Sequence, residues 1–559
     1  MMHITRAMRW PAVEVIRIAL SRDLRAIGRV LTKKWFIFIA CLWAVQASAQ
    51  GTYTAASCSE VAVLAAVTAE QAHAVDGDII SIPAGSCAWT TQLTATFNNS
   101  VTIQGAGAIS ATTGGASTSG SDLTSITDDV GGDLQINTMS GKSVRITGIA
   151  DIGSSSAGNG SWQILGTSSA VRVDHCHIVV TSASSVGLYI GGSVTGVADH
   201  DYFDSGAGGF IDNPIAVHNG NGWNGTSSAD NSFHSWAYPD NFGSSQFFFF
   251  EDDLWSQADI GDSHDGARYV IRHSTYTGSH GQMYNHGITD AAVFPMKAVE
   301  IYLNNFDTSP SNSAPAFSNN GGALLFWGNT STGHQYMTQF AYTRVNNGTY
   351  NYGTVPNGWG NCAGGGAYTA WDYGSNGPCM AQPGLGPGDL LSGTSFPNIV
   401  NSTTGTQSWP HQTLDPIYVW ANTFNDAGYS PEGYLQNSIT ALLADNKNYY
   451  QQFNSSYGEP GNFNGTAGVG QGSSLPSTAQ PTCTPGSTAL PSGTIWLGVS
   501  VSGNWGPGYW DTSNNTLYIC TSTNTWTAYY TPYTYPNPLT QSSTGTTVAA
   551  PTNLSAIVQ

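Results

Sequence analysis

The sequence predicts an all-β solenoid, a coil of short parallel strands, and three features support this fold class. The chain has 559 residues, which exceeds the usual size of one compact core and favours an elongated or repetitive architecture. An eight-residue frame recurs, with apolar residues at positions 1 and 3 and usually a small polar residue at position 6. Gly, Pro and Asn separate the strand-like pieces, as expected for turns.

The recurring frame sets the period of the coil. Its copies begin at Val171, Thr195, Ile215, Phe248, Tyr269, Val299, Leu324 and Ile417. Successive starts from 171 to 324 lie 20 to 33 residues apart, and parallel strands stacked about 4.8 Å above one another, with inserted loops, give such a period. Position 6 holds Asn304, Asn329 and Asn422, which predicts side-chain amides stacked at a bend. A β-sandwich is the alternative, but its strands seldom repeat one frame together with its bend residue.

The first 49 residues have the pattern of a secretory signal. The apolar stretch "WFIFIACLWAV" follows eight basic residues and precedes Ala47 to Ala49, so we expect residues 1–49 to be a signal peptide cleaved near Ala49. The stretch is too short to span a bilayer. Its n-region is long, so either the signal is extended or translation starts further in. The expected location is outside the cell, in the periplasm or at the cell surface.

The net charge of the chain indicates which classes of binding partner to expect. After residue 49 the chain has 8 basic and 33 acidic residues, a formal charge of -25. Nucleic acids and anionic membranes require basic patches, so we expect neither as a partner. We expect a monomer whose partner is a polysaccharide.

The cysteines suit an oxidising compartment. Seven of them follow residue 49, and each of three pairs brackets one local segment. We therefore predict the disulfides Cys58–Cys87, Cys362–Cys379 and Cys483–Cys520. The remaining Cys176 falls on a frame strand, where a buried core thiol is expected rather than a catalytic one.

One short helix is predicted at residues 57–74, ahead of the strands. Ser57 and Glu60 have capping-box spacing. The expected apolar face consists of Val61, Leu64, Ala65 and Val67.

With this helix, the segment "VTIQGAG" and the repeated frame, the chain resembles the right-handed parallel β-helix proteins of the pectate-lyase-like superfamily over residues 55–455. The helix is similar to their N-terminal cap. The resemblance implies a right-handed parallel β-helix; it is specific for the fold, since the chain contains no complete catalytic motif of any one lyase or hydrolase family.

The predicted β-helix domain occupies residues 50–455. Residues 456–492 are rich in Gly, Ser, Thr and Pro and predict a linker. Residues 493–559 predict a small aromatic β-module and tail. This module is either an appended domain or a C-terminal strap, and folding alone would require its disulfide.

The outward face of the coil is where we expect function. Side chains alternate along a strand, so frame positions 2 and 4 point outward when positions 1 and 3 point inward. In "FFFFEDDL" this alternation puts Phe248 and Phe250 inside and Glu251 outside. Position 4 then forms one column: Asp174, Ala198, His218, Glu251, Arg272, Tyr302, Trp327 and Trp420.

A column of charges followed by aromatic rings is typical of a polysaccharide groove, because sugars offer hydroxyls to charged groups and C–H faces to flat rings. The expected sugar-binding residues are Tyr302, Trp327, Trp420, His273 and Arg268. Two other interpretations stay open. In the first, Glu251 and Arg272 are only a cross-strand ion pair and bind no sugar. In the second, the loop between residues 340 and 410 covers the tryptophans.

Two cleavage reactions fit these residues. In a β-elimination on a uronate polymer, a base removes the proton beside the carboxyl group while a cation neutralises that carboxylate. The candidate base is Arg272, Lys297 or a nearby histidine, and the candidate ligands of a Ca²⁺ ion are Glu251, Asp252 and Asp262. In a hydrolysis, two carboxyl groups roughly 5 to 10 Å apart act together. The candidates there are Glu251, Asp252 and Asp265, whereas Asp253 occupies the bend position and is assigned to structure.

The predicted function is a secreted polysaccharide-degrading enzyme, a β-eliminative lyase on a uronate-containing polysaccharide. A β-helix glycoside hydrolase with paired carboxylates is the first alternative. The second is a non-catalytic carbohydrate-binding surface protein or adhesin, which the abundant Gly, Ser, Thr and Asn suit equally well.

Overall fold

The structure is a computed structural model. It describes residues 49–153, 160–181, 186–205, 211–220, 235, 238–260, 263, 266–278, 283–284, 296–307, 315–340, 383–386, 413–425, 435–437, 445–452, 463–474, 483–485, 495–496, 499–500 and 505–541. The chain divides into two compact units, Met1–Gln50 and Gly51–Gln559. The predicted signal peptide, up to residue 48, and the predicted Cys362–Cys379 disulfide lie outside the described residues.

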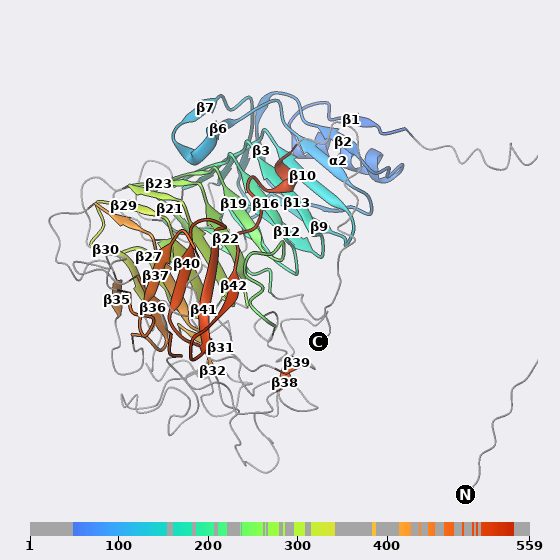
Figure 1. Cartoon of the computed structure of the whole chain (residues 1–559). Helices are drawn as coiled ribbons and strands as arrows, with labels where there is room; N and C mark the ends of the chain where they lie inside the picture. Colours follow the sequence, from blue (N-terminus) through green and yellow to red (C-terminus); the bar gives the residue numbers. More distant parts are fainter. Residues whose placement is uncertain are drawn as a thin grey trace, which may run out of the picture. The chain divides into compact units, whose positions relative to one another are not determined.

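The second unit contains three long parallel sheets (Figure 1). Sheet A contains β1 (Thr52–Thr54), β2 (Asp78–Ser81), β5 (Val101–Gln104), β10 (Ser143–Thr147), β13 (Ala170–Asp174), β16 (Gly196–Asp199), β19 (Phe248–Glu251), β22 (Arg268–Arg272), β25 (Ala298–Tyr302), β28 (Ala323–Trp327), β33 (Ile417–Trp420) and β36 (Tyr449–Gln451). Sheet B contains β3 (Gly85–Trp89), β8 (Thr124–Asp128), β11 (Ala150–Gly153), β14 (His177–Val180), β17 (Tyr202–Asp204), β20 (Leu254–Ser256), β23 (Thr275–Thr277), β26 (Asn305–Asp307), β29 (Thr330–Thr332) and β34 (Thr423–Phe424). Sheet C contains β4 (Leu93–Thr96), β9 (Leu134–Thr138), β12 (Trp162–Gly166), β15 (Leu188–Ile190), β18 (Ile211–Val217) and β21 (Ala258–Ile260).

The chain visits the three sheets in turn, which confirms the predicted coil. From β10 to β21 each turn adds one strand to sheet A, one to sheet B and one to sheet C, and each strand pairs in parallel with its equivalent in the next turn. The protein is therefore an all-β parallel β-helix. Further along, β24 (Met283–Tyr284), β27 (Pro315–Asn319), β30 (Tyr336–Phe340) and β35 (Leu435–Asn437) form a separate parallel sheet.

The interior of the coil is filled by the apolar positions of the frame. Val171 and Val173 on β13, and Phe248 and Phe250 on β19, are fully buried in one continuous hydrophobic core. Two copies of the frame differ from the prediction. Gly196, not Thr195, pairs with Val171, and the copy at Ile215 belongs to sheet C. Gly196 takes the place of the apolar residue at frame position 1, so this copy is hard to recognise in the sequence. A Cβ atom there would lie 2.0 Å from the carbonyl oxygen of Val171, which excludes an apolar side chain.

The bend between sheets A and B carries the predicted amide ladder. Asn304 N donates to Asn329 Oδ1 at 3.0 Å, and Asn329 N donates to Asn422 Oδ1 at 2.9 Å. Asp253 occupies the same position two turns earlier, where its Oδ1 accepts a hydrogen bond from Asp201 N at 2.8 Å. Its structural assignment is therefore confirmed.

The helix α2 (Glu60–Gln71) packs on the first strands, as predicted, but its cap and its apolar face differ. Ser59 is the N-cap residue, but its side chain makes no capping hydrogen bond. The Ser59 hydroxyl instead contacts the hydroxyl of Ser57, at 2.9 Å. Val61 and Leu64 are exposed, and the buried face consists of Val63, Ala66, Val67 and Glu70. In the part of the chain that the structure describes, no helix is long and apolar enough to cross a membrane.

Two of the predicted disulfides are present. Cys58–Cys87 joins the residues before α2 to β3, and Cys483–Cys520 links a segment of the predicted linker to the last sheet. Cys176 is a free thiol and is buried, as expected.

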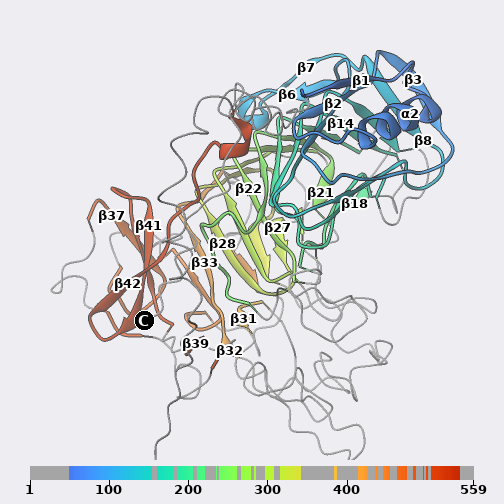
Figure 2. The ribbon, with the colours of Figure 1, turned by 90° about the vertical axis from the view of Figure 1, so that its right-hand side faces the viewer.

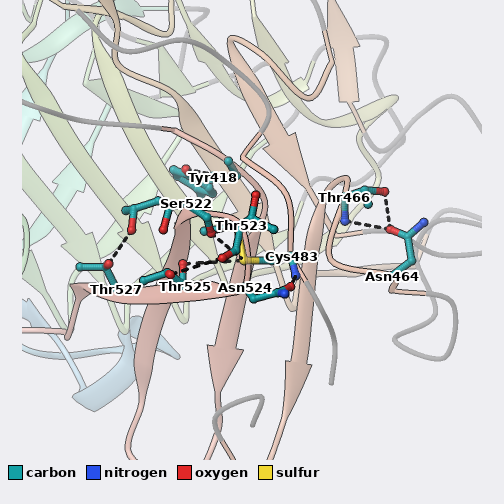
Figure 3. The surroundings of a disulfide bond; sticks show 12 residues. Tyr418, Asn464, Thr466, Cys483, Ser522, Thr523, Asn524, Thr525 and Thr527 are labelled. Carbon is teal, nitrogen blue, oxygen red and sulfur yellow. Dashed lines mark hydrogen bonds between the residues drawn. A yellow bond between two sulfur atoms is a disulfide. The ribbon is translucent and has the colours of Figure 1, made fainter. Parts of the chain in front are cut away.

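The C-terminal residues form a small sheet beside sheet A (Figure 2). It contains β37 (Val469–Gly472), β40 (Gly508–Asp511), β41 (Thr516–Ser522) and β42 (Thr525–Tyr530). β37 lies inside the region predicted as a linker, so the sheet begins earlier than expected. Figure 3 shows Cys483 next to the β41–β42 turn, where Cys483 N donates to Asn524 Oδ1 at 3.2 Å.

The remaining elements are short. They are β6 (Ile109–Ala111), η1 (Thr113–Gly115), β7 (Thr118–Gly120), β31 (Leu385–Gly386), β32 (Thr413–Leu414), β38 (Ile495–Trp496), β39 (Val499–Ser500) and η7 (Pro538–Thr540). η7 ends the segment 531–541, which we call the strap; it follows β42 and reaches β13 and β16.

Candidate functional site

The outward column of sheet A exists, but its predicted exposure is wrong. The register places Glu251 beside Arg272, then Tyr302, Trp327 and Trp420 on successive strands. Glu251, Arg272 and Trp420 have no exposed surface, and Trp327 is 7% exposed. The C-terminal sheet and the strap cover this part of the outer face. In the other half of the column, Asp199 stands where Ala198 was predicted, and His218 belongs to a different sheet.

Glu251 and Arg272 form a buried ion pair with no free hydrogen-bonding capacity toward a substrate. Arg272 Nε donates to Glu251 Oε2 at 2.7 Å, and its two other nitrogens donate to Tyr302 Oη and to the carbonyls of residues 533 and 534 in the strap. Asn537 N donates to the second oxygen of Glu251 at 2.7 Å. Burial raises the pKa of Glu251 against the effect of Arg272. The cross-strand ion pair is thus the interpretation that the contacts favour.

The three aromatic rings stack on one another and on the C-terminal sheet. The ring centroids of Tyr302 and Trp327 are 4.7 Å apart, and those of Trp327 and Trp420 are 5.7 Å apart, with nearly parallel planes. Trp510 covers both tryptophans at 4.9 and 5.3 Å. Trp327 Nε1 also donates to Tyr530 Oη at 3.3 Å. These rings therefore hold the C-terminal sheet in place; the predicted cover, residues 340–410, is mostly outside the described residues.

Asp252 and His273 lie at the corner between sheets A and B, and the strap contacts both. Tyr535 Oη donates to Asp252 Oδ1 at 2.9 Å, and its ring stacks on His273 with centroids 3.6 Å apart. Asp252 also accepts a hydrogen bond from Gly114 N at 2.7 Å. Burial lowers the pKa of His273 to about 4, so this imidazole is neutral. Asp252 is almost fully buried, and Tyr535 covers one face of the partly exposed His273.

Arg268 and Lys297 belong to a buried cluster away from the column. Lys297 Nζ forms ion pairs with Asp415, at 2.7 Å, and with Asp240. Arg268 donates to the carbonyls of Ser235 and of residues 238 and 240. Burial opposes the charge of Lys297, but the two carboxylates outweigh it and raise its pKa. Lys297 is therefore unsuited to act as a base.

Of the expected calcium ligands, Glu251 and Asp252 are among the described residues. Asp262 and the hydrolase candidate Asp265 lie outside them. Both oxygens of Glu251 are occupied by Arg272 and Asn537, so Glu251 does not fit a calcium ligand. Among the residues that the structure describes, no group of three or more His, Cys, Asp or Glu side chains is placed to hold a metal ion.

The part of the sheet A face that stays accessible carries two aspartate–histidine pairs, which the prediction missed. His175 Nδ1 lies 2.9 Å from Asp174 Oδ2, and His200 Nδ1 lies 3.1 Å from Asp199 Oδ2. The two imidazole rings are parallel, with centroids 5.2 Å apart. Both histidines adopt positive φ angles, of 53° and 59°, at the corner that follows β13 and β16.

Two arginines complete this cluster. Arg145 binds both oxygens of Asp174 at 2.6 Å, and Arg172 binds both oxygens of Asp199 at 2.8 Å. The aspartates are fully buried, whereas the side chains of His175 and Arg145 are 50% and 40% exposed.

In this cluster the pKa of one aspartate is lowered and the pKa of one histidine is raised. Arg145 and His175 hold the pKa of Asp174 well below its usual range, against the effect of burial. The hydrogen bond to Asp199 raises the pKa of His200. The cluster therefore combines the ionised carboxylate of Asp174 with the partly exposed imidazoles of His175 and His200.

A repeated dipeptide marks this cluster in the sequence. "VRVDH" and "GVADH" both place Asp and His at frame positions 4 and 5 once the frame of β16 begins at Gly196. With the frame one residue too early, the second copy puts Ala198 in the column and the pattern disappears.

Comparisons with known proteins add no relative. No family model matches the chain, and it matches neither a curated protein nor a solved structure. The resemblance to the pectate-lyase-like superfamily stays a prediction.

Proposed function

We propose that the chain is a secreted polysaccharide-degrading enzyme, a lyase that cleaves a uronate-containing polysaccharide by β-elimination, with its reaction at the pairs Asp174–His175 and Asp199–His200. One observation carries this proposal. The buried carboxylate of Asp174 contacts both Arg145 and His175, and these two side chains are 40% and 50% exposed. A base and a cation are thus held side by side, and elimination requires this combination.

The proposed roles follow from the hydrogen bonds. With Nδ1–H donating to Asp174, His175 presents the lone pair of Nε2 as the base. Asp199 raises the pKa of His200, which favours its protonated form and suits a general acid. Arg145 neutralises the substrate carboxylate while the proton beside it is removed.

The elimination balances in one step. His175 takes the proton from the carbon that bears the carboxyl group, and the C–H electron pair forms a double bond to the neighbouring ring carbon. The glycosidic C–O bond on that carbon breaks, and its oxygen receives a proton from His200. The products are a new reducing end and an unsaturated uronate end.

Charge at this site supports an acidic substrate despite the acidity of the protein. Of the eight basic residues after residue 49, Lys142, Arg145 and Arg172 lie on or beside β10 and β13. These side chains offset part of the repulsion that a polyuronate meets near an acidic protein. The hydrolase alternative has less support, since Glu251 is buried and its oxygens are occupied.

The test uses the mature protein with polygalacturonate, alginate and a neutral glucan. We expect ultraviolet absorbance from the unsaturated uronate with an acidic polymer, and a loss of about a hundredfold or more in His175→Ala. His73→Ala, an exposed histidine on the turn after α2, is the matched control and should retain the parent rate. Reducing ends without the absorbance would identify a hydrolase, and glycan binding without cleavage would identify the adhesin.

A further inference from the structure

The C-terminal sheet has two different faces. On one face Trp510, Leu517 and Tyr530 pack against the rings of sheet A in a buried cluster. Tyr509 pairs with Tyr518 one residue further along the ladder, so its side chain points to the opposite face. There Tyr509, Phe463 and Trp526 lie with ring centroids 5.9 to 6.1 Å apart, and all three are partly exposed. The sheet thus carries a second aromatic cluster that its docking does not use.

Two glycines of β37 make room for these rings. A Cβ atom at Gly470 would lie 2.4 Å from the ring of Phe463, and one at Gly472 would lie 2.2 Å from Tyr509 Oη. The rings therefore lie directly over the backbone of β37, where any side chain would displace them. The three rings are tilted against one another by 43° to 59°, and the backbone of β37 supports those of Phe463 and Tyr509 from below.

The surroundings of the cluster are polar and almost without charge. Between residues 461 and 559 the only Lys, Arg, Asp or Glu is Asp511. Asp511 Oδ1 accepts hydrogen bonds from the backbone and side chain of Ser513. Tyr518 pairs with Tyr509 and therefore shares its face, where it adds a phenolic hydroxyl.

We infer that Phe463, Tyr509 and Trp526 form a binding site for a neutral glycan. Flat rings pack on the C–H faces of a sugar, and hydroxyls of the sheet are suited to the hydroxyls at its edge. Residues 461–559 contain no Lys or Arg, so this segment offers no cation to phosphate or carboxylate groups, and its charge favours an uncharged chain over a nucleic acid or a polyuronate. This site is separate from the proposed cleavage site and does not depend on lyase activity.

The experiment measures retardation of the mature protein in native gels that contain soluble β-glucan, xylan or polygalacturonate. We expect retardation by a neutral glycan, with Trp526→Ala and Tyr509→Ala each weakening it about tenfold or more. Tyr336→Ala is the matched control, because Tyr336 is also a partly exposed tyrosine on a strand but lies on β30. It should be retarded like the parent. Near-ultraviolet circular dichroism of each variant checks that the sheet remains folded.

The outcomes separate this inference from the proposed function. A lyase whose retardation by neutral glycans is unchanged in both ring variants overturns the site. Retardation by polygalacturonate alone, or self-association that the ring variants abolish, overturns it as well. Glycan binding that survives His175→Ala but is lost in Trp526→Ala supports it even when no cleavage is detected.

Discussion

Arg272 and Thr534 are 262 positions apart in the sequence, yet Arg272 Nη2 donates a hydrogen bond of 2.9 Å to the carbonyl oxygen of Thr534. A second nitrogen of the same guanidinium donates to the carbonyl of Tyr533 at 2.8 Å. The charged end of the sheet A column therefore fastens the strap to the coil. The aromatic end does the same for the C-terminal sheet through Trp510.

Arg272→Ala should destabilise the fold rather than act only on catalysis. The substitution leaves Glu251 buried without its guanidinium and frees the strap, so we expect a loss of about 3 to 5 kcal/mol in unfolding free energy. Denaturant unfolding followed by fluorescence measures it. Lys142→Ala, at an ion pair with Asp76 that is 33% and 51% exposed, should lose about 1 kcal/mol or less. Equal losses in the two variants would contradict the structural role of Arg272.

Much of the coil could be predicted because it depends on local alternation. Phe248 and Phe250 are buried and Glu251 faces outward, as the period of two requires. The amides at Asn304, Asn329 and Asn422 stack because each repeats at the same bend. The disulfides at Cys58 and Cys483 follow the same logic, since each closes a local segment.

The state of the outer face could not be predicted from the frame. The alternation of side chains predicts that Trp327 points away from the core. The side chain that covers it belongs to Trp510, which is far along the chain. Such a contact has no periodic signal, because it depends on a second sheet folding back. The Asp–His pairs were missed for a different reason: Gly196 replaces an apolar frame residue under steric pressure from the neighbouring strand.

Asn329→Ala should show how much the amide ladder stabilises the coil. Asn329 is fully buried, its Oδ1 accepts from Asn304 N, and its Nδ2 donates to Asn422 Oδ1 at 3.0 Å. The variant leaves buried partners unsatisfied, so we expect a loss of about 1 to 3 kcal/mol in chemical denaturation. Asn425→Ala, at an exposed asparagine after β34, is the control and should be nearly neutral. A neutral Asn329→Ala would show that the ladder contributes nothing.

Removal of the Cys483–Cys520 disulfide should loosen the C-terminal sheet selectively. The bond spans 37 residues and holds the segment before β38 against β41, so its loss in the double Ser variant should lower stability by about 2 to 4 kcal/mol. Acrylamide quenching of tryptophan fluorescence should increase, because Trp327, Trp420 and Trp510 lose their cover. The double Ala variant of Cys58 and Cys87, at the other end of the coil, should increase quenching less, because Trp89 rather than the three stacked tryptophans lies beside that disulfide. An equal increase in both variants would indicate general unfolding instead.

The docking of the C-terminal sheet should weaken as the pH rises. Glu300 on β25 is fully buried, and it accepts hydrogen bonds from Tyr530 Oη at 2.9 Å and Gly243 N at 2.7 Å. Burial raises the pKa of Glu300 from 4.5 to about 7. A raised carboxyl pKa means that the folded state favours the neutral form. The stabilisation is therefore complete below pH 4.5 and is lost as the pH rises through about 7.

Glu300→Gln should remove this dependence, because the amide stays neutral. The difference in unfolding free energy between parent and variant should change by about 3 kcal/mol between acidic and neutral pH. Taking that difference removes the contribution of Asp415, whose pKa is also about 7. Tyr530→Phe provides the second arm: the hydrogen bond from Tyr530 lowers the pKa of Glu300, so its loss should move the transition to higher pH. A Glu300→Gln protein with the same pH profile as the parent would show that this carboxyl does not control docking.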